Sequence, residues 1–367
     1  MRQNRNRYAV VLTAAGIVLS GILTACGGAG TNVRAVGETA ETVTEAEVRE
    51  TVHIELETQA QVKLADTKAT DAQPEAVELE TEAESGNEEC VLLFAGDVYL
   101  SEYVLNAYDN AGGIHGVLDE TILAEIEAAD IFMVNQEFPF TERGTPAEDK
   151  QFTFRLPESR VHMMNEMGID IVTLANNHIL DYGPEGITDS IAALNAAGIR
   201  YVGAGENLEE AKKLEIMEIN GTKIGFLGTS RVYMDPSWAA GAGHPGVFST
   251  YDPTLAVEEI KKAREQVDYL VVYVHWGVER ETEPKDYQRT MGQQYIDAGA
   301  DIVIGSHPHV LQPVEYYKEK PIVYSLGNFV FGSSIPETEL FKVVLDGENV
   351  AVTEIPCTSS GGYTRVK

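Results

Sequence analysis

The chain is short of cysteine and of basic side chains, and both shortages exclude classes of protein. Its 367 residues include 3 Cys, none of them in a Cys-x-x-Cys pair, so we expect neither a disulfide-rich scaffold nor a Cys-based structural zinc site. Only 27 Lys and Arg stand against 58 Asp and Glu, a formal net charge of −31. A surface this acidic repels phosphate backbones, which argues against a nucleic-acid partner. The sequence also lacks the Gly-x-Ser-x-Gly nucleophile motif and the phosphate-binding P-loop.

The first 26 residues have the order of a secretory signal. Arg2, Arg5 and Arg7 precede an apolar stretch at residues 9–25, which is short for a bilayer span of about 20 residues. The stretch ends in Leu-Thr-Ala followed by Cys26. This ending resembles the bacterial lipoprotein box, which implies that Cys26 is lipidated and anchors the protein to the extracytoplasmic face of the cell membrane. An uncleaved anchor helix is the alternative.

Residues 27–89 form a second segment, rich in Glu, Thr, Ala and Val. From residue 27 to residue 90 the chain holds 16 acidic and 4 basic side chains. Such a segment buries too little apolar surface to offset its chain entropy, so we predict an acidic, disordered stalk kept extended by charge repulsion. A helix or strand here is the alternative. Residues 90–367 are expected to form the folded domain.

Within that domain, short apolar runs alternate with amphipathic stretches. Predicted strands lie at residues 91–95, 131–134, 171–175, 199–202, 214–219, 223–227, 268–274, 302–304, 322–325, 329–331, 340–345 and 350–355, and predicted helices at 122–129, 184–197 and near 286–298. Strands that alternate with helices, together with hairpins near the end of the chain, predict an α/β layered domain.

Polar side chains follow nearly every predicted strand. They are Asp97, Asn135, Glu137, Asn176, Asn177, His178, Asp181, His275, Glu279, His307, His309 and Asn328. Taken singly, each has an ordinary role as a cap, a turn residue or a buried imidazole. However, the carboxyl ends of parallel strands meet at one edge of a sheet, and functional sites are built there. We therefore expect these side chains to converge.

The donor types favour a metal site. Four of the 8 His in the chain lie in these clusters, beside carboxylates and amides. This mixture suits zinc, manganese or iron better than calcium, which prefers oxygen ligands. Because Pro308 biases the preceding residue toward extended geometry, His307 and His309 are predicted to point to the same side of an extended segment.

The order of these segments resembles the CapA family of poly-γ-glutamate capsule synthesis proteins, from residue 91 to residue 331. The motifs are Phe94-Ala95-Gly96-Asp97, Asn135-Gln136-Glu137, Leu174-Ala175-Asn176-Asn177-His178, His275-Trp276-Gly277-Val278-Glu279, Gly305-Ser306-His307-Pro308-His309 and Ser325-Leu326-Gly327-Asn328. That family is similar to the calcineurin-like metallophosphoesterases. The resemblance implies a four-layer α/β/β/α sandwich with a two-metal site.

By the same resemblance, each site residue has an implied role. Asp97 and His309 would bind the first divalent ion, Glu137 would bridge both ions, and Asn177, His275 and His307 would bind the second. His178, with Asp181 nearby, is similar to the general acid that protonates the leaving oxygen. Tyr99 departs from the metallophosphoesterase pattern, which has His at that position. A site with one ion is therefore an alternative to a site with two.

The family name implies a role in making, exporting or anchoring a γ-linked glutamate polymer, with a membrane-bound synthase as partner. Two hypotheses remain open: a metal-dependent hydrolase, and a non-catalytic partner that binds the polymer. Because the domain is acidic, an acidic polymer must be recognised locally. The candidate substrate-binding residues are Asn135, Asn176, Arg155, Arg231, Glu279 and Asn328, and the long segment 230–251 is a candidate lid.

Cys90 and Cys357 abut the first and last of the predicted strands. In an oxidising compartment they could form one disulfide that closes the domain. Two buried, reduced thiols are the alternative.

Overall fold

The computed structural model describes residues 89–347 and 349–367. The predicted leader (1–26) and, apart from Glu89, the predicted stalk (27–89) lie outside the described residues. In the described part of the chain we find no helix with the length and apolar character of a membrane span.

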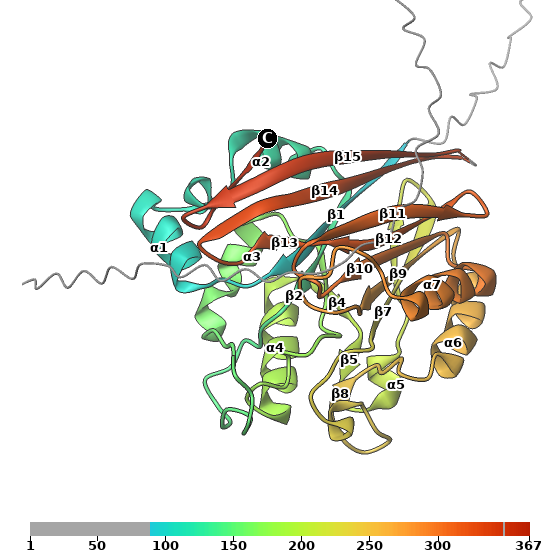
Figure 1. Ribbon diagram of the computed structural model, residues 1–367, viewed down its shortest axis with the longest axis horizontal. Coiled ribbons are helices and arrows are strands. Elements are labelled where there is room, and N and C mark those ends of the chain that lie inside the picture. Colours follow the sequence, from blue (N-terminus) through green and yellow to red (C-terminus); the bar gives the residue numbers. More distant parts are fainter. Residues whose placement is uncertain (1–88, 348) are drawn as a thin grey trace, which may run out of the picture. The chain divides into compact units, whose positions relative to one another are not determined.

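Two large sheets form the centre of the domain (Figure 1). The larger has the order β16 (Tyr363–Val366), β15 (Asn349–Ser360), β14 (Ser334–Asp346), β1 (Cys90–Val98), β2 (Ile131–Gln136), β3 (Ile171–Thr173) and β4 (Arg200–Val202), and β13 (Asn328–Val330) pairs with β1. The smaller has the order β11 (Leu311–Tyr317), β12 (Lys320–Leu326), β10 (Ile302–Ser306), β9 (Tyr269–His275), β7 (Thr222–Ser230) and β6 (Glu215–Ile219). A third, short sheet pairs β5 (Ala204–Gly205) with β8 (Gly246–Val247).

Helices cover the outer face of each large sheet. The first group is α1 (Glu102–Ala111), α2 (Glu120–Glu127), α3 (His162–Glu166) and α4 (Pro184–Ala197), whose apolar residues pack on the larger sheet. The second group is α5 (Leu208–Ala211), α6 (Thr254–Arg264) and α7 (Asp286–Ala298), which packs on the smaller sheet. Short 3-10 turns lie at Ile114–Gly116, Glu158–Val161 and Pro236–Trp238. Figure 1 shows α4 and the pair α6–α7 on opposite sides of the sheets.

The alternation of side chains along the strands explains this layering. On β1, Leu92 and Phe94 join a core shared with Phe226 of the smaller sheet, whereas Leu93 and Ala95 join the core beneath the first group of helices. Because successive side chains of a strand point to opposite faces, a strand that is apolar throughout must be covered on both sides. The fold is therefore a four-layer α/β/β/α sandwich, which confirms the predicted fold class.

Parallel pairing brings the ends of the strands together. In the larger sheet β1, β2, β3 and β4 are parallel neighbours, and in the smaller sheet β7, β9, β10 and β12 are parallel neighbours. The register sets Asp97 beside Asn135, and His275 beside Ser306. The polar residues that follow these strands therefore lie at the same edge of each sheet.

The disulfide considered for Cys90 and Cys357 is wrong for this structure, in which both thiols are free and buried. The two residues lie on opposite sides of β14, Cys90 beside Leu345 and Cys357 beside Thr338. These two positions on β14 are about 23 Å apart along an extended strand. A disulfide requires Cα atoms within about 7 Å, so the backbone geometry forbids this bridge.

Candidate metal centre

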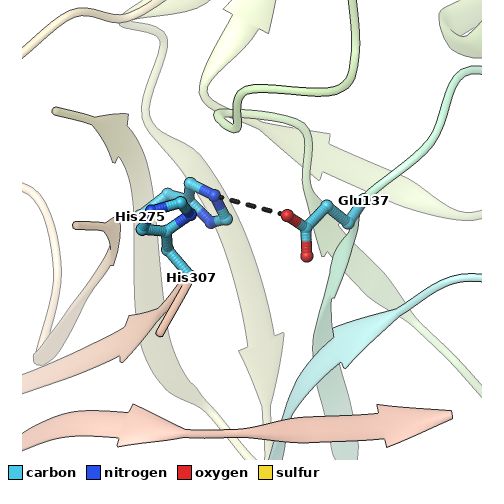
Figure 2. A group of neighbouring side chains, drawn as sticks. All are labelled: Glu137, His275 and His307. Atoms are coloured by element: carbon cyan, nitrogen blue, oxygen red, sulfur yellow. Dashed lines mark ion pairs between the residues drawn. The ribbon is translucent and has the colours of Figure 1, made fainter. Parts of the chain in front are cut away.

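Glu137 lies at the middle of the candidate site. It follows β2, is 0% exposed, and neither of its carboxylate oxygens has a hydrogen-bond partner among the described residues. Because a buried carboxylate without a partner is strongly destabilising, a cation is the expected partner. Figure 2 shows this carboxylate facing the imidazoles of His275 and His307.

Two groups of potential ligands share Glu137. One group also contains His275 and His307, and the other contains Asp97 and His309; in each group one donor atom per residue lies within 4.8 Å of the others. Glu137 Oε1 is 3.6 Å from His275 Nε2 and 3.9 Å from His309 Nε2. Glu137 is thus the residue that the two groups have in common.

The ligands come from both large sheets. Asp97 lies in β1 and Glu137 directly after β2, both in the larger sheet. His275 is the last residue of β9 and His307 directly follows β10, both in the smaller sheet. The centre therefore forms where the carboxyl ends of parallel strands from the two sheets approach each other, as we expected.

The backbone of the His307–His309 segment differs from the prediction. His307 has φ of 99° and His309 has φ of 59°, so neither residue is extended. Positive φ is costly for a residue other than glycine, and such strain is retained mainly at functional sites. Both imidazoles nevertheless reach the centre, with their ring centroids 5.9 Å apart.

Asn177 lies beside the group that contains Glu137, His275 and His307. Its Oδ1 lies 2.8 Å from His275 Nε2, the same nitrogen that faces Glu137. The other ring nitrogen of His275, Nδ1, lies 2.9 Å from the hydroxyl of Ser306. A partner on the outer nitrogen fixes the orientation of a ligand imidazole, so Ser306 supports His275 from behind.

Burial keeps two of the imidazoles neutral. It lowers the pKa of His275 well below its usual value, and electrostatic interaction with His307 and His309 acts in the same direction. Burial also lowers the pKa of His307 to about 3, and His307 Nδ1 is buried without a hydrogen-bond partner. Neutral imidazoles with a free nitrogen are the form that binds metal ions.

Electrostatic interactions among Glu137, Asp97 and His309 shift the pKa values of all three groups. Burial, followed by repulsion from Asp97, raises the pKa of Glu137 well above its usual value. Burial alone would lower the pKa of His309, but the charges of Glu137 and Asp97 outweigh it and raise the pKa to about 10. Although burial opposes the effect, the hydrogen bond from His309 lowers the pKa of Asp97. A cation is thus favoured between these two carboxylates.

His178 and Asp181 form a pair beside the ligands. His178 Nδ1 lies 2.7 Å from Asp181 Oδ2, and His178 Nε2 lies 4.0 Å from Glu137 Oε1. Lys150, which sequence reasoning missed, lies 3.0 Å from His178 Nδ1 and also contacts Asp181 and the backbone oxygen of Asn177. Lys150 lies in a loop with no periodic pattern of apolar residues. Its only signal in the sequence is that it lies shortly before Phe154 and the candidate substrate-binding residue Arg155.

Tyr99 does not serve as a ligand in this arrangement. Its ring stacks on Phe154 with centroids 4.1 Å apart, and Phe154 stacks on His178 with centroids 4.2 Å apart. Where the resemblance leads us to expect a ligand imidazole, the chain has an aromatic stack that holds His178 in place. The group of ligands that contains Asp97 is therefore limited to Asp97, Glu137 and His309.

The three amide side chains that were predicted to bind substrate have different surroundings. Asn135 and Asn176 are 0% exposed; Asn135 donates to Asp97 Oδ1 at 2.8 Å, and Asn176 donates to Asn135 Oδ1 at 3.0 Å. These bonds orient a ligand from within the protein. Asn328 is half-buried, with its Oδ1 2.8 Å from His309 Nδ1.

The charged residues that were predicted to bind substrate lie around the centre. Arg155 is exposed and its guanidinium covers the ring of Tyr182, while Arg231 is half-buried and donates its backbone N–H to His275 O at 2.9 Å. Glu279 is exposed and follows His275 by four residues. The segment 230–251 contains Trp238, whose ring lies 5.3 Å from Lys150 Nζ.

The donor set suits a divalent transition metal. It combines imidazole nitrogens, carboxylates and one amide oxygen, and its buried atoms without partners are the two oxygens of Glu137 and Nδ1 of His307. Buried polar atoms are usually hydrogen-bonded, and three of the six described exceptions gather at this centre. The residues therefore fit a metal centre.

Comparison with known proteins identifies a family for this chain. The sequence model of the family described as "Bacterial capsule synthesis protein PGA_cap" matches residues 91–333. "PGA biosynthesis protein CapA" of Bacillus subtilis (strain 168) is 35% identical over 244 residues, 65% of this chain and 62% of that protein. "Capsule biosynthesis protein CapA" of Bacillus anthracis is 32% identical over 260 residues, 69% of this chain and 62% of that protein.

A third relative, "Probable polyglutamine synthesis accessory protein MT0602" of Mycobacterium tuberculosis (strain CDC 1551 / Oshkosh), is 32% identical over 217 residues, 56% of this chain and 57% of that protein. The chain thus spans less than two thirds of the length of these relatives. The family match covers all the segments that supply the ligands described above. This chain belongs to the bacterial capsule synthesis protein family PGA_cap.

Proposed function

We propose that this protein is a metal-dependent hydrolase of poly-γ-glutamate capsule synthesis that acts on the extracytoplasmic face of the cell membrane. The observation that carries the proposal is the buried carboxylate of Glu137, which lies without a hydrogen-bond partner between two groups of ligands. The names of the capsule biosynthesis relatives supply the pathway.

In this proposal the two groups of ligands hold up to two divalent ions of manganese, zinc or iron. Asp97 and His309 would hold one ion, Asn177, His275 and His307 would hold the other, and Glu137 would contribute to both. Such ions polarise a phosphoryl or carbonyl oxygen and lower the pKa of bound water. Asn135 and Ser306 keep the ligands oriented through the hydrogen bonds described above.

His178 acts as the general acid. Asp181 accepts the hydrogen bond of Nδ1–H, which directs Nε2 toward the centre. Burial lowers the pKa of His178 while Asp181 opposes the shift, and the imidazolium form would give its Nε2 proton to the leaving oxygen or nitrogen of the substrate. The stack of Phe154 on the ring limits its rotation, and Lys150 offsets the negative charge of Asp181.

The substrate class is an ester or amide of an acidic envelope polymer, either a phosphoester or a γ-glutamyl bond. The name of the mycobacterial relative, an accessory protein, supports a partnership with a membrane-bound synthase. A lipid on Cys26 would keep the domain beside that synthase.

The test is metal-dependent hydrolysis by the purified full-length chain. We expect cleavage of an aryl phosphate or of γ-linked glutamate oligomers that stops on chelation and returns with Mn²⁺, Zn²⁺ or Fe²⁺. Glu137→Gln is expected to abolish it, whereas Glu339→Gln, which changes another buried glutamate on β14, keeps it. Equal activity of the chelated and metal-loaded chains would overturn the proposal.

A second candidate is a non-catalytic partner that binds the polymer. Tyr99 favours it, because Tyr99 stands where the metallophosphoesterase pattern has a histidine, and the group that contains Asp97 and His309 therefore lacks one imidazole. In that case the metal-loaded chain binds γ-linked glutamate oligomers without cleaving either substrate, and His178→Ala leaves capsule formation in cells unchanged.

A further inference from the structure

Three arginines near the metal centre have no carboxylate partner. Residues 91–367 hold 42 acidic and 20 basic side chains, so a basic side chain of this domain has acidic neighbours in excess. Most of its Lys and Arg form ion pairs, but within the described residues none is found for Arg155, Arg231 or Arg280. The backbone of Arg231 is hydrogen-bonded to that of His275, the backbone of Arg280 is hydrogen-bonded to that of Pro308, and Arg155 follows Phe154, which stacks on His178. A cation left unpaired in so acidic a domain is available to an external anion.

Arg231 is the most firmly held of the three. It directly follows β7, and its backbone N–H donates to His275 O at 2.9 Å, so it begins beside a metal ligand. Its guanidinium carbon lies 4.4 Å from the ring centroid of Tyr251 and 4.3 Å from that of Tyr287. The hydroxyl of Tyr287 is hydrogen-bonded to the backbone of Gly277, two residues after His275. The rings thus fix the guanidinium next to the turn that follows the ligand.

This arrangement leaves donors of Arg231 unused. A guanidinium has five N–H donors, and the partners of Arg231 among the described residues are Tyr251 O, at 2.7 Å from Nη1, and the hydroxyl of Tyr287. Rings stacked on the faces of a guanidinium leave its edge open. A planar edge with two parallel N–H groups matches a carboxylate in a bidentate pair. Because the side chain is already ordered, binding costs little additional conformational entropy.

Arg155 repeats the arrangement on the side of the larger sheet. It directly follows Phe154, the residue stacked on His178, and its guanidinium carbon lies 4.2 Å from the ring centroid of Tyr182. Arg155 is exposed and has no ion pair among the described residues. The general acid therefore has one ring-supported arginine in its neighbourhood, and the ligand His275 has the other.

We propose that Arg231 and Arg155 bind carboxylates of the substrate on either side of the metal centre. The substrate class is a polymer with a free carboxylate on every residue, such as γ-linked glutamate, whose cleaved bond would lie between two bound residues. This inference rests on the proposed function for the location of the reaction, but carboxylate binding by Arg231 is measurable without any reaction.

The test is binding of a fluorescent γ-linked glutamate oligomer to the purified full-length chain that carries Glu137→Gln, in which no cleavage is expected. Arg231→Met is expected to weaken binding about tenfold or more, since a charge-assisted hydrogen-bonded pair is lost. Arg231→Lys is expected to recover part of that loss. The matched control is Arg365→Met on β16, because Arg365 also lacks an ion pair among the described residues.

A second oligomer separates charge recognition from packing. In γ-linked isoglutamine oligomers an α-amide replaces each free α-carboxylate, so their affinity is expected to be weak and equal in the parent and in Arg231→Met. If Arg231→Met unfolds, Tyr251→Leu removes one stacking ring at a side chain that is 63% exposed, and it should weaken binding in the same direction. Arg155→Met is expected to act similarly.

The inference is overturned if Arg231→Met binds the glutamate oligomer as tightly as Arg365→Met, or if it loses affinity equally for the amidated oligomer. The experimental results that would refute this inference differ from those that would refute the proposed function. Arg231-dependent binding without metal-dependent hydrolysis refutes only the hydrolase. Metal-dependent hydrolysis of an aryl phosphate together with Arg231-independent oligomer binding refutes only the carboxylate subsite.

Discussion

At the scale of single residues, the imidazole of His178 is held from three directions. Phe154 stacks on its ring, Asp181 is hydrogen-bonded to Nδ1, and Lys150 lies 3.0 Å from the same nitrogen. A side chain that served only to fill space would not need this number of polar contacts. The arrangement suits a residue that must present one nitrogen in a fixed direction.

We predict that His178→Ala lowers kcat by about 10²- to 10⁴-fold, the usual contribution of a general acid. Its metal content should be unchanged, because His178 is not among the ligands. Steady-state kinetics and elemental analysis of the same preparation check both points. A parallel loss of bound metal would show that His178 supports the centre and does not act as the acid.

A second prediction concerns Glu339 on β14, which is 7% exposed. Burial, with a smaller effect of Glu354, raises its pKa from 4.5 to about 7. As the pH rises, Glu339 therefore ionises first in the unfolded chain, so its contribution to stability is complete below about pH 4.5 and is lost by about pH 7.

Glu339→Gln removes this pH dependence. The variant should be more stable than the parent by about 3 kcal/mol at pH 8 and equally stable near pH 4. Urea denaturation at the two pH values measures the difference. The same difference at both values would mean that ionisation of Glu339 is not its cause.

At the scale of elements, the site depends on a close approach of two backbones. A Cβ atom at Gly96 in β1 would lie 1.8 Å from the backbone oxygen of Gly327, which accepts a hydrogen bond from the N–H of Asp97 at 2.9 Å. Only glycine at position 96 allows this contact, which holds Asp97 in its position at the centre.

We predict that Gly96→Ala lowers the free energy of unfolding by about 2–4 kcal/mol. Gly332→Ala is the matched control, because a Cβ there would meet no atom within 4 Å. Equilibrium unfolding of the two variants decides the matter. If they prove equally stable, the approach of β1 to Gly327 is looser than described.

Elements with a strong apolar pattern were predictable from the sequence. The helix predicted at 184–197 is α4 with the same bounds, and the strand predicted at 302–304 is the core of β10. In contrast, α1 and β11 were missed. Helix α1 buries only Val104, and β11 is an edge strand with mostly half-exposed side chains, so neither has a continuous apolar pattern.

The sequence predicted which residues form the candidate site, but it predicted their conformations less well. All six predicted ligands converge, because parallel strand ends must meet at one edge. The conformation of His307 was not predictable, since Pro308 favours extended geometry and tertiary contacts override that local preference. Lys150 was missed because its role depends on a loop whose path no local pattern encodes.

At the scale of the whole molecule, the proposal places a hydrolytic domain outside the cytoplasm on a lipidated Cys26. Cys26→Ala is expected to move the protein from the membrane fraction to the soluble fraction and to abolish incorporation of a labelled fatty acid. The control is Cys90→Ala, which changes a buried free thiol. Membrane association and labelling that persist in Cys26→Ala would contradict lipidation at this residue.

The central claim is that Glu137 joins two groups of ligands around bound metal. The most direct measurement is the number of Mn²⁺ or Zn²⁺ ions bound per full-length chain, determined by elemental analysis after chelation, reloading and dialysis. We predict up to two ions in the parent and in Glu339→Gln, and loss of metal in Glu137→Gln, whose amide cannot bridge two cations. Retention of the same number of ions in Glu137→Gln would contradict the account.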